Sequence, residues 1–144
     1  MSDIVVRCVD LSDSPSFDHL ADGLFDDPID RDRLNEFLVD PHHHLAIAQD
    51  GETIVGFASG VDYIHPDKAR ELWINEVSVA SNYRRLGLGK AIIARLLEHG
   101  RGLGCAEAWV LTDASNKAAR SLYRSSGGEE SECVMVSFDL SHRP

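Results

Sequence analysis

Cysteine is scarce in this 144-residue sequence, and Cys8, Cys105 and Cys133 are widely spaced and form no CxxC pair. Three isolated thiols argue against a disulfide framework or a zinc site and favour a reducing compartment. Long apolar runs are also missing, and no basic segment followed by an apolar one stands at the N-terminus. A membrane-spanning helix needs roughly 20 apolar residues. We therefore expect a cytoplasmic protein without membrane span or export signal.

Positive charge is in short supply, because 14 Lys and Arg face 24 Asp and Glu, for a formal net charge of −10. The excess of acids lies entirely in residues 1–60, which hold 13 acids against three arginines. The remaining residues hold 11 acids and 11 bases. The negative electrostatic potential of these acids repels nucleic acid and attracts a cationic partner. The same excess of acids can also serve solubility alone.

Internal repeats and linkers are absent too, so we expect one globular domain over residues 1–144. Apolar periodicity and cap residues predict the elements. In chain order they are a strand over 4–9, a helix over 15–25 capped by Ser14, a short helix capped by Asp30, strands over 44–48, 54–58 and 72–79, a long helix over 88–103, a strand over 106–112, a helix over 118–125 and a strand over 133–140. This order predicts an α/β (α+β) fold.

Three of these elements can be specified further. Asp50-Gly51 supplies the positive φ angles that a tight hairpin between the second and third strands needs. Residues 106–112 are apolar almost throughout, which is typical of a strand covered on both faces. Apolar residues alternate along 133–140, which predicts a half-buried closing strand.

A basic segment with two glycines, Arg84-Arg85-Leu86-Gly87-Leu88-Gly89, connects strand 72–79 to the long helix. Glycines let the backbone approach a ligand closely, and the free amides of a helix N-terminus attract anions. The segment therefore predicts a pyrophosphate site. It is not a Walker loop, since Ala91 follows Lys90 where Ser or Thr is needed, and Ile92 replaces the small residue of a dinucleotide fingerprint.

Through Arg84, Gly87 and Gly89 the chain resembles the GNAT acetyltransferase superfamily, whose signature at this junction is Gln/Arg-x-x-Gly-x-Gly/Ala. The family's order of elements covers nearly the whole chain, and Asn116 and Leu122-Tyr123 stand where the family has Asn and Leu-Tyr. The resemblance implies a single GNAT domain with about four helices and a mixed, mostly antiparallel sheet split at the acetyl-CoA site. It also implies direct acetyl transfer from acetyl-CoA to an amine in a ternary complex.

The resemblance further implies roles for individual residues. Tyr123 is expected to protonate the departing thiolate, and Glu76 is the first candidate for the base that takes the proton of the amine. Asp113 and Asp139 are the next candidates, as bases or as counter-ions for substrate ammonium groups. The coenzyme is expected to contact Val77, Ser78, Val79, Arg84, Arg85, Leu86, Gly87, Leu88, Gly89, Lys90, Asn116 and Ala119.

Within the family, segments 71–79, 112–123 and 134–139 resemble the short aminoglycoside 3-N-acetyltransferases that modify gentamicin. The resemblance implies that the first two helices form one wall of the acceptor cleft, and residues 13–40 contain nine acids against two arginines. A polycationic small amine, most simply an aminoglycoside, is the expected acceptor. Polyamines or peptide amines satisfy the same electrostatics, and a non-catalytic acyl-CoA-binding module is a further alternative. The candidate acceptor residues are Asp26, Asp27, Asp30, Asp32, Glu76, Asp113 and Asp139.

Two further expectations concern metals and oligomers. The run His42-His43-His44 does not predict a metal site, because consecutive residues of an extended chain point to opposite sides, and no metal cofactor is expected. Dimers are common in the family, and the apolar last strand is a candidate contact in a homodimer. The sequence alone leaves the oligomeric state open.

Overall fold

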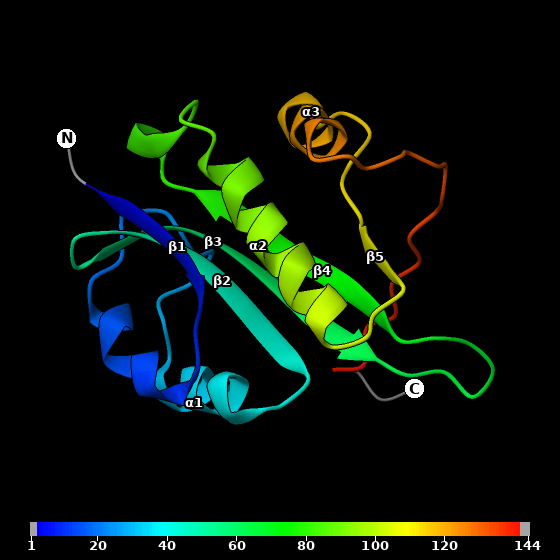
Figure 1. The fold of residues 1–144 in the computed structure, drawn as a ribbon, viewed down its shortest axis with the longest axis horizontal. Coiled ribbons are helices and arrows are strands. Elements are labelled where there is room, and N and C mark those ends of the chain that lie inside the picture. Colours follow the sequence, from blue (N-terminus) through cyan, green and yellow to red (C-terminus); the bar gives the residue numbers. More distant parts are fainter. Residues whose placement is uncertain (1–2, 142–144) are drawn as a thin grey trace.

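The apolar segments assemble into one five-stranded sheet in a computed structural model, which describes residues 3–141 (Figure 1). The strands stand in the order β1-β2-β3-β4-β5, antiparallel except for the parallel pair β4–β5. The elements, with η for a 3-10 helix, are β1 (Ile4–Cys8), η1 (Leu11–Asp18), α1 (Arg31–Val39), β2 (His43–Asp50), β3 (Thr53–Tyr63), β4 (Glu71–Val79), η2 (Ser81–Tyr83), α2 (Leu88–Gly102), β5 (Glu107–Val110) and α3 (Lys117–Ser125).

Helix α2 covers one face of the sheet and forms the larger core. Its apolar stripe buries Ile92 and Leu96 completely against strands β1 to β4. The approach is close at β3, where a Cβ on Gly56 would lie 2.8 Å from the Ile92 Cδ1 atom. Among residues 3–141 no helix is long and apolar enough to cross a membrane.

The opposite face of β2 and β3 is covered by η1, α1 and the segment between them. Phe17, Leu24 and Leu34 are buried there against Ile47 and Phe57. No helix among the described residues covers the same face of β4 and β5, where the rings of Trp73 and Trp109 stack at 5.3 Å. Both faces of the sheet are therefore covered at β2 and β3, whereas at β4 and β5 no described helix covers the face opposite α2.

The predicted helix over residues 15–25 is wrong. Asp10, rather than Ser14, caps a 3-10 helix that ends at Asp18. The next residues bond to the start of β3, because the Ala21 amide donates to the Ile54 carbonyl and the Ile54 amide donates to His19, both at 2.9 Å. The apolar residues at helical spacing do pack against the core, with Phe17 and Leu24 buried, but they belong to a 3-10 helix and to a loop whose backbone is hydrogen-bonded to the sheet.

The predicted closing strand over 133–140 is also wrong, since residues 129–140 form no helix or strand. Without a following strand, β5 is the edge of the described sheet and shorter than predicted. Its residues Ala108, Trp109 and Val110 are half-buried, so the expected cover on both faces is wrong as well. The hairpin lies where predicted, with positive φ at Gly51 only, and Asp30 caps α1 as expected.

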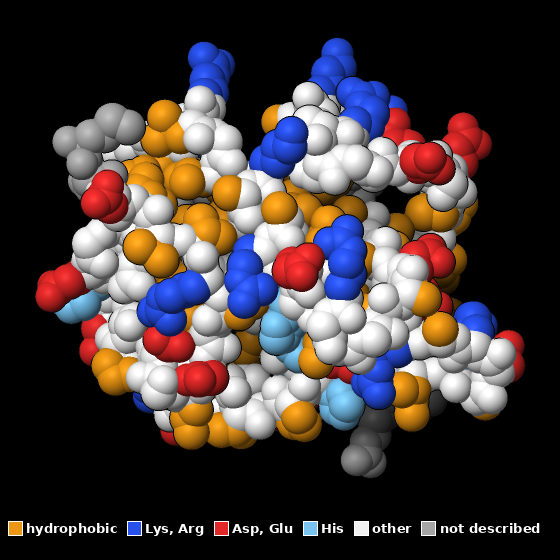
Figure 2. Space-filling model, viewed as in Figure 1, with side chains coloured by type: hydrophobic (Ala, Val, Ile, Leu, Met, Phe, Trp, Pro, Cys, Tyr) orange, Lys and Arg blue, Asp and Glu red, His pale blue; other side chains and the backbone are white. Residues whose placement is uncertain are grey.

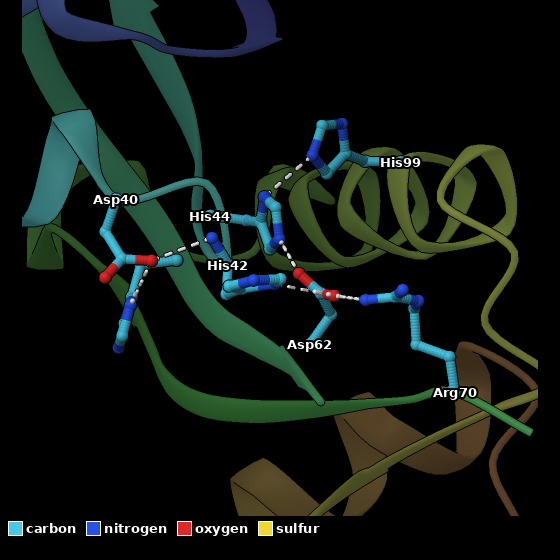
Figure 3. A network of polar contacts seen from close by, with 7 residues as sticks. Asp40, His42, His44, Asp62, Arg70 and His99 are labelled. Carbon is cyan, nitrogen blue, oxygen red and sulfur yellow. Dashed lines mark hydrogen bonds and ion pairs between the residues drawn. The ribbon is translucent and has the colours of Figure 1, made fainter. Parts of the chain in front are cut away.

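A buried polar network ties β2, β3 and α2 together at the end of the sheet where β4 begins (Figure 3). The Asp62 side chain is only 2% exposed and accepts hydrogen bonds from His44 at 2.6 Å, from His42 at 3.3 Å and from Arg70. His44 reaches His99 of α2 through its other ring nitrogen at 2.9 Å. Burial alone would raise the pKa of Asp62, but these hydrogen bonds outweigh it and lower that pKa to about 2.

We expect Asp62→Asn to lower the free energy of unfolding by about 2 to 4 kcal/mol at neutral pH, because it removes the charged acceptor of a buried network. The pKa of Asp62 is lower in the folded than in the unfolded chain, so this stability is present above about pH 4 and lost toward pH 2. Urea denaturation at several pH values measures the difference. Asp67→Asn, at an exposed carboxylate in the β3–β4 loop, is the matched control. An equal loss in both variants would contradict the assigned role.

Candidate active site

The sheet opens where β4 and β5 part. The two strands pair only from Glu71–Glu107 to Ile74–Val110, whereas β4 continues to Val79. The backbone of residues 75–79 therefore has β3 on one side and no described strand on the other. Such free peptide groups must find other partners, and an extended ligand with amide groups can bond to them as an added strand.

A β-bulge sets the side-chain directions along this open edge. The β3–β4 register shifts between Ser59, which lies opposite Glu76, and Gly60, which lies opposite Ile74, so Asn75 is the extra residue. The bulge brings Val77 and Val79 onto the α2 face that Leu72 and Ile74 also occupy. Glu76 consequently points to the opposite face, and it is exposed.

The segment that follows β4 turns sharply into α2. Gly87 has φ +77° and is the N-cap of α2, and no side chain caps the helix. Arg85, at φ +66°, is the one non-glycine residue with positive φ among residues 3–141. The amides of the first α2 turn have no partner within the helix and no competing cap, so they can donate to an anion. The residues present thus fit a pyrophosphate group.

Helix α3 packs against this first turn of α2. A Cβ on Gly89 would lie 3.1 Å from the Leu122 Cδ2 atom, so only glycine permits the observed approach without displacement. Tyr123, the next residue of α3, is half-buried. Its hydroxyl makes no hydrogen bond within the described part of the chain, and burial raises its pKa. Tyr123 therefore keeps its proton at neutral pH and can act as a proton donor.

Basic side chains gather on the two elements beside this opening, the segment before α2 and helix α3. Figure 2 shows Lys and Arg side chains over the segment that precedes α2 and over α3, at the end of the molecule where Figure 1 places both elements. Exposed residues of this group are Arg84, Arg85, Lys90, Lys117 and Arg124. The Arg84 Nε atom donates to the Val79 carbonyl at 3.2 Å, which links the segment to the end of β4. The group offers a phosphate-bearing ligand several cations.

Asn116 and Ala119, both predicted to contact the coenzyme, form the N-terminal cap of α3. The Asn116 side chain accepts the Ala119 amide at 3.1 Å and is the N-cap of the helix. Asp113 lies in the exposed connection between β5 and α3, and its carbonyl accepts the Asn116 amide at 2.9 Å. All three residues thus belong to the elements that border the opening.

The predicted acceptor residues divide into separate groups. Asp26 and Asp27 follow Phe25, whose ring stacks on Phe57 at 4.1 Å, and Phe57 lies opposite Ser78 of β4. Figure 1 shows segment 19–29 rising from η1 toward the end that carries the first turn of α2 and then returning to α1.

Asp30 and Asp32 stand at the first turn of α1, farther along the same path. The Asp30 carboxylate accepts the Arg33 amide, so it serves as a cap. Asp139 lies on the exposed segment after α3, outside the sheet. The structure thus brings Asp26 and Asp27, but not Asp139, to the part of the sheet where β4 ends.

Sequence reasoning missed the bulge at Asn75, although a signal was present. The β4 residues that pack into the α2-side core stand at 72, 74, 77 and 79, and the step of three between apolar residues breaks the period of two expected for a regular strand. That step marks the place where the strand turns a new set of side chains toward each face.

The model of the acetyltransferase (GNAT) family matches residues 8–127. The chain belongs to the GNAT acetyltransferase family. Acetyl-CoA is the cosubstrate of this family. Related GNAT proteins include the N-alpha-acetyltransferase RimI of Mycobacterium tuberculosis, 35% identical over 102 residues, which are 71% of this chain and 62% of RimI. The L-2,4-diaminobutyric acid acetyltransferase of Shouchella clausii is 32% identical over 54% of this chain and 43% of its own length.

Solved GNAT structures share the whole fold. The aminoglycoside acetyltransferase meta-AAC0020, from an uncultured soil metagenomic sample and in complex with sisomicin, matches with a TM-score of 0.83 at 21% identity over 95% of this chain and 96% of its own. The aminoglycoside N-acetyltransferase AAC(6')-Iy with CoA gives 0.79 at 22% identity over 97% of each chain. The expected fold, a mostly antiparallel mixed sheet split beside β4, is therefore confirmed.

We expect Gly87→Ala to weaken acetyl-CoA binding about tenfold, because a side chain at φ +77° costs about 1 to 2 kcal/mol and shifts the turn that orients the α2 amides. Calorimetric titration with acetyl-CoA measures the dissociation constant. Gly102→Ala, at the other end of α2 with open space and no positive φ, is the control and should bind normally. Equal affinities of the two variants would exclude the turn from coenzyme binding.

Proposed function

We propose that the chain transfers the acetyl group of acetyl-CoA to a primary amine of a polycationic small molecule of the aminoglycoside class. The observation that carries the proposal is a separation of charge around the opening at the end of β4. Cations of the segment before α2 and of α3 lie on one side, and Glu76, Asp26 and Asp27 belong to the other face and its covering segment. A polyanionic coenzyme and a polycationic acceptor are both attracted to this place.

The coenzyme supplies an acetyl thioester, and we assign its binding to the backbone and side chains already described. The amides of residues 88–90 and the cations Arg84 and Arg85 are proposed to hold the pyrophosphate. The open backbone edge at Val77, Ser78 and Val79 is proposed to hold the amide-bearing arm of the coenzyme. In this assignment Asn116 and Ala119 act by holding the start of α3 in place.

Proton transfers are assigned to two side chains. An alkyl ammonium must lose its proton before it can attack, and Glu76 is the carboxylate that β4 itself presents at the opening. Tyr123 is assigned the proton that the departing thiolate takes up, which agrees with its raised pKa. Asp113 is proposed as a counter-ion for a further ammonium group, since it lies in the exposed connection beside the opening.

The similarity to solved aminoglycoside acetyltransferases supports this acceptor class, as does the excess of acids in residues 13–40. Acetylation removes one positive charge from the acceptor, so an antibiotic-resistance function follows for an aminoglycoside. The free thiols Cys8, Cys105 and Cys133 suit a reducing cytoplasm. We further propose that residues 1–144 form one catalytic domain.

A second candidate acceptor is the α-amino group of a peptide. The observation in its favour is the 35% identity to RimI, an N-alpha-acetyltransferase. The two candidates differ in what must be recognised, because an aminoglycoside offers several ammonium groups in a compact molecule and a peptide offers a single terminal amine on an extended backbone. Turnover on a panel of acceptors separates them.

We expect Tyr123→Phe to lower kcat about 100-fold and to leave the acetyl-CoA dissociation constant unchanged, because it removes a proton donor and little volume. Thiol release measured at saturating acceptor gives kcat. Tyr63→Phe makes the same change at a hydroxyl that accepts the Trp109 indole N–H at 2.7 Å, away from the opening, and should retain kcat. Normal turnover of Tyr123→Phe would remove this residue from the mechanism.

The acceptor class is tested by thiol release from acetyl-CoA with gentamicin, sisomicin, spermidine and peptides with free N-termini. We expect the highest kcat/KM with the aminoglycosides. Asp26→Asn with Asp27→Asn should raise the KM for the aminoglycoside about tenfold and change kcat little, since each charge steers and holds the acceptor. Asp67→Asn with Glu98→Gln, a double change at exposed acids elsewhere, is the matched control.

A preference for peptides would replace the proposed acceptor class and leave the acetyltransferase reaction intact. Coenzyme binding without turnover on any amine would instead favour an acyl-CoA-binding module. A KM that stays constant in the Asp26 and Asp27 double variant would make segment 19–29 a solvated surface.

A further inference from the structure

The segment that connects β4 to α2, residues 80–87, carries mostly exposed side chains. Ala80 is buried and Tyr83 is half-buried, whereas the rest of the segment is exposed. In Figure 1 this segment (green) projects beyond the end of the sheet. A segment with little buried surface depends on specific contacts to keep one conformation. The contacts of Ala80 and Tyr83 therefore matter for the position of the turn that follows them.

The first contact joins the segment to the backbone of β3. The β2–β3 register shifts between Ala48 and Gln49, which leaves Val55 of β3 as the extra residue of a second bulge. The Ala80 amide donates to the Val55 carbonyl at 2.8 Å. A bulge leaves backbone groups outside the regular ladder of the sheet, and here one of them binds the chain after β4. This contact fixes where the segment begins.

The second contact joins side chains. The Tyr83 hydroxyl donates to the Asp50 Oδ2 atom at 2.5 Å, and the Tyr83 ring packs against the core on the α2 side. Asp50 is the last residue of β2 and pairs with Ile4 of β1 and Thr53 of β3, so neighbouring strands on both sides hold its backbone. The hydrogen bond to the carboxylate raises the pKa of Tyr83, so the hydroxyl keeps its proton and remains a donor.

The residues that follow Tyr83 are those assigned to the pyrophosphate. Arg84 and Arg85 come next in the chain, and Gly87 is the N-cap of α2. Because this connection is so short, a displacement of Tyr83 also displaces the two guanidinium groups and the first-turn amides of α2. A hydrogen bond to a charged acceptor is stronger than one between neutral groups, so it can resist such a displacement.

We propose that Tyr83 is a positioning residue for the coenzyme. Its hydrogen bond to Asp50 holds the two arginines and the first-turn amides of α2 in the arrangement that receives the pyrophosphate. This role rests on the proposed binding of the pyrophosphate at this turn, and it does not depend on which amine is the acceptor. The β2–β3 hairpin thereby takes part in coenzyme binding without touching the coenzyme.

Two acetyl donors separate this role from a merely structural one. Acetyl-CoA carries the pyrophosphate, whereas acetyl-pantetheine has the same thioester and amide-bearing arm without it. A variant that only weakens the fold impairs the use of both donors alike. A variant that displaces the pyrophosphate turn impairs the use of acetyl-CoA alone.

We expect Tyr83→Phe to raise the acetyl-CoA dissociation constant and KM about tenfold, with kcat and the KM of the acceptor unchanged, because a hydrogen bond to a carboxylate is lost. The kcat/KM for acetyl-pantetheine should stay the same. Calorimetric titration gives the dissociation constant, and thiol release with the best amine of the acceptor panel gives the kinetic values. Tyr63→Phe, at another hydroxyl that donates to a carboxylate, that of Glu71 at 3.4 Å, is the matched control and should change none of them.

Variants of the acceptor side of the bond complete the test. Asp50→Ala should weaken acetyl-CoA binding as Tyr83→Phe does, and the double variant should bind no more weakly than either single variant, since both remove one interaction. Asp50→Asn keeps an oxygen that can accept the hydroxyl and should retain most of the affinity.

Normal acetyl-CoA affinity in Tyr83→Phe, or an equal loss of activity with both donors, would overturn the role of Tyr83. Gly87→Ala tells this failure from a failure of the proposed coenzyme site. If Gly87→Ala weakens acetyl-CoA binding and Tyr83→Phe does not, the turn binds the coenzyme but Tyr83 does not position it. If neither variant weakens binding, the assignment of the pyrophosphate to this turn fails as well.

Discussion

The early end of the pairing between β4 and β5 is the constraint on which the site depends. Four residue pairs join the strands, and beyond Ile74 and Val110 they no longer pair. The open part of β4 then has free peptide groups, the bulge at Asn75 turns Glu76 to the face opposite α2, and α2 begins after the short segment that follows β4. Because the segment between β4 and α2 is short, the backbone edge and the first-turn amides of α2 must lie near each other.

The sequence predicts the elements whose signals are local. The glycine-bearing turn before α2, the Asp30 cap and the hairpin at Gly51 each depend on residues within a few positions, and all lie where expected. Tyr123 could be singled out only through the resemblance to the family, because Asn116 and Leu122-Tyr123 stand where the family has Asn and Leu-Tyr. Its position beside the first turn of α2, set by the Gly89–Leu122 contact, is tertiary and could not be predicted from residue spacing.

The failures have a common physical cause, which is competition for backbone hydrogen bonds. Residues 19–21 have helical spacing, but pairing with Ile54 satisfies their peptide groups better than a further helical turn. Residues 133–140 have the alternation of a strand, but a strand needs a neighbour to pair with. No strand of the described sheet pairs with these residues. Periodicity reports which side chains prefer burial and not which backbone is available to pair with them.

The polar network around Asp62 and the opening at the end of β4 stand at opposite ends of the sheet, and this separation has a consequence for how the scaffold can diversify. His44, Asp62 and His99 join β2, β3 and α2 at the end of the sheet away from the proposed site, so this end of the frame is held together independently of that site. Segment 19–29, which borders that end, is attached by two backbone hydrogen bonds at Ile54 and by the stacking of Phe25 on Phe57. Its exposed carboxylates can therefore be exchanged for other side chains at little cost to folding, and under the proposed acceptor assignment a change of charge on this one segment would select a different acceptor without a new fold.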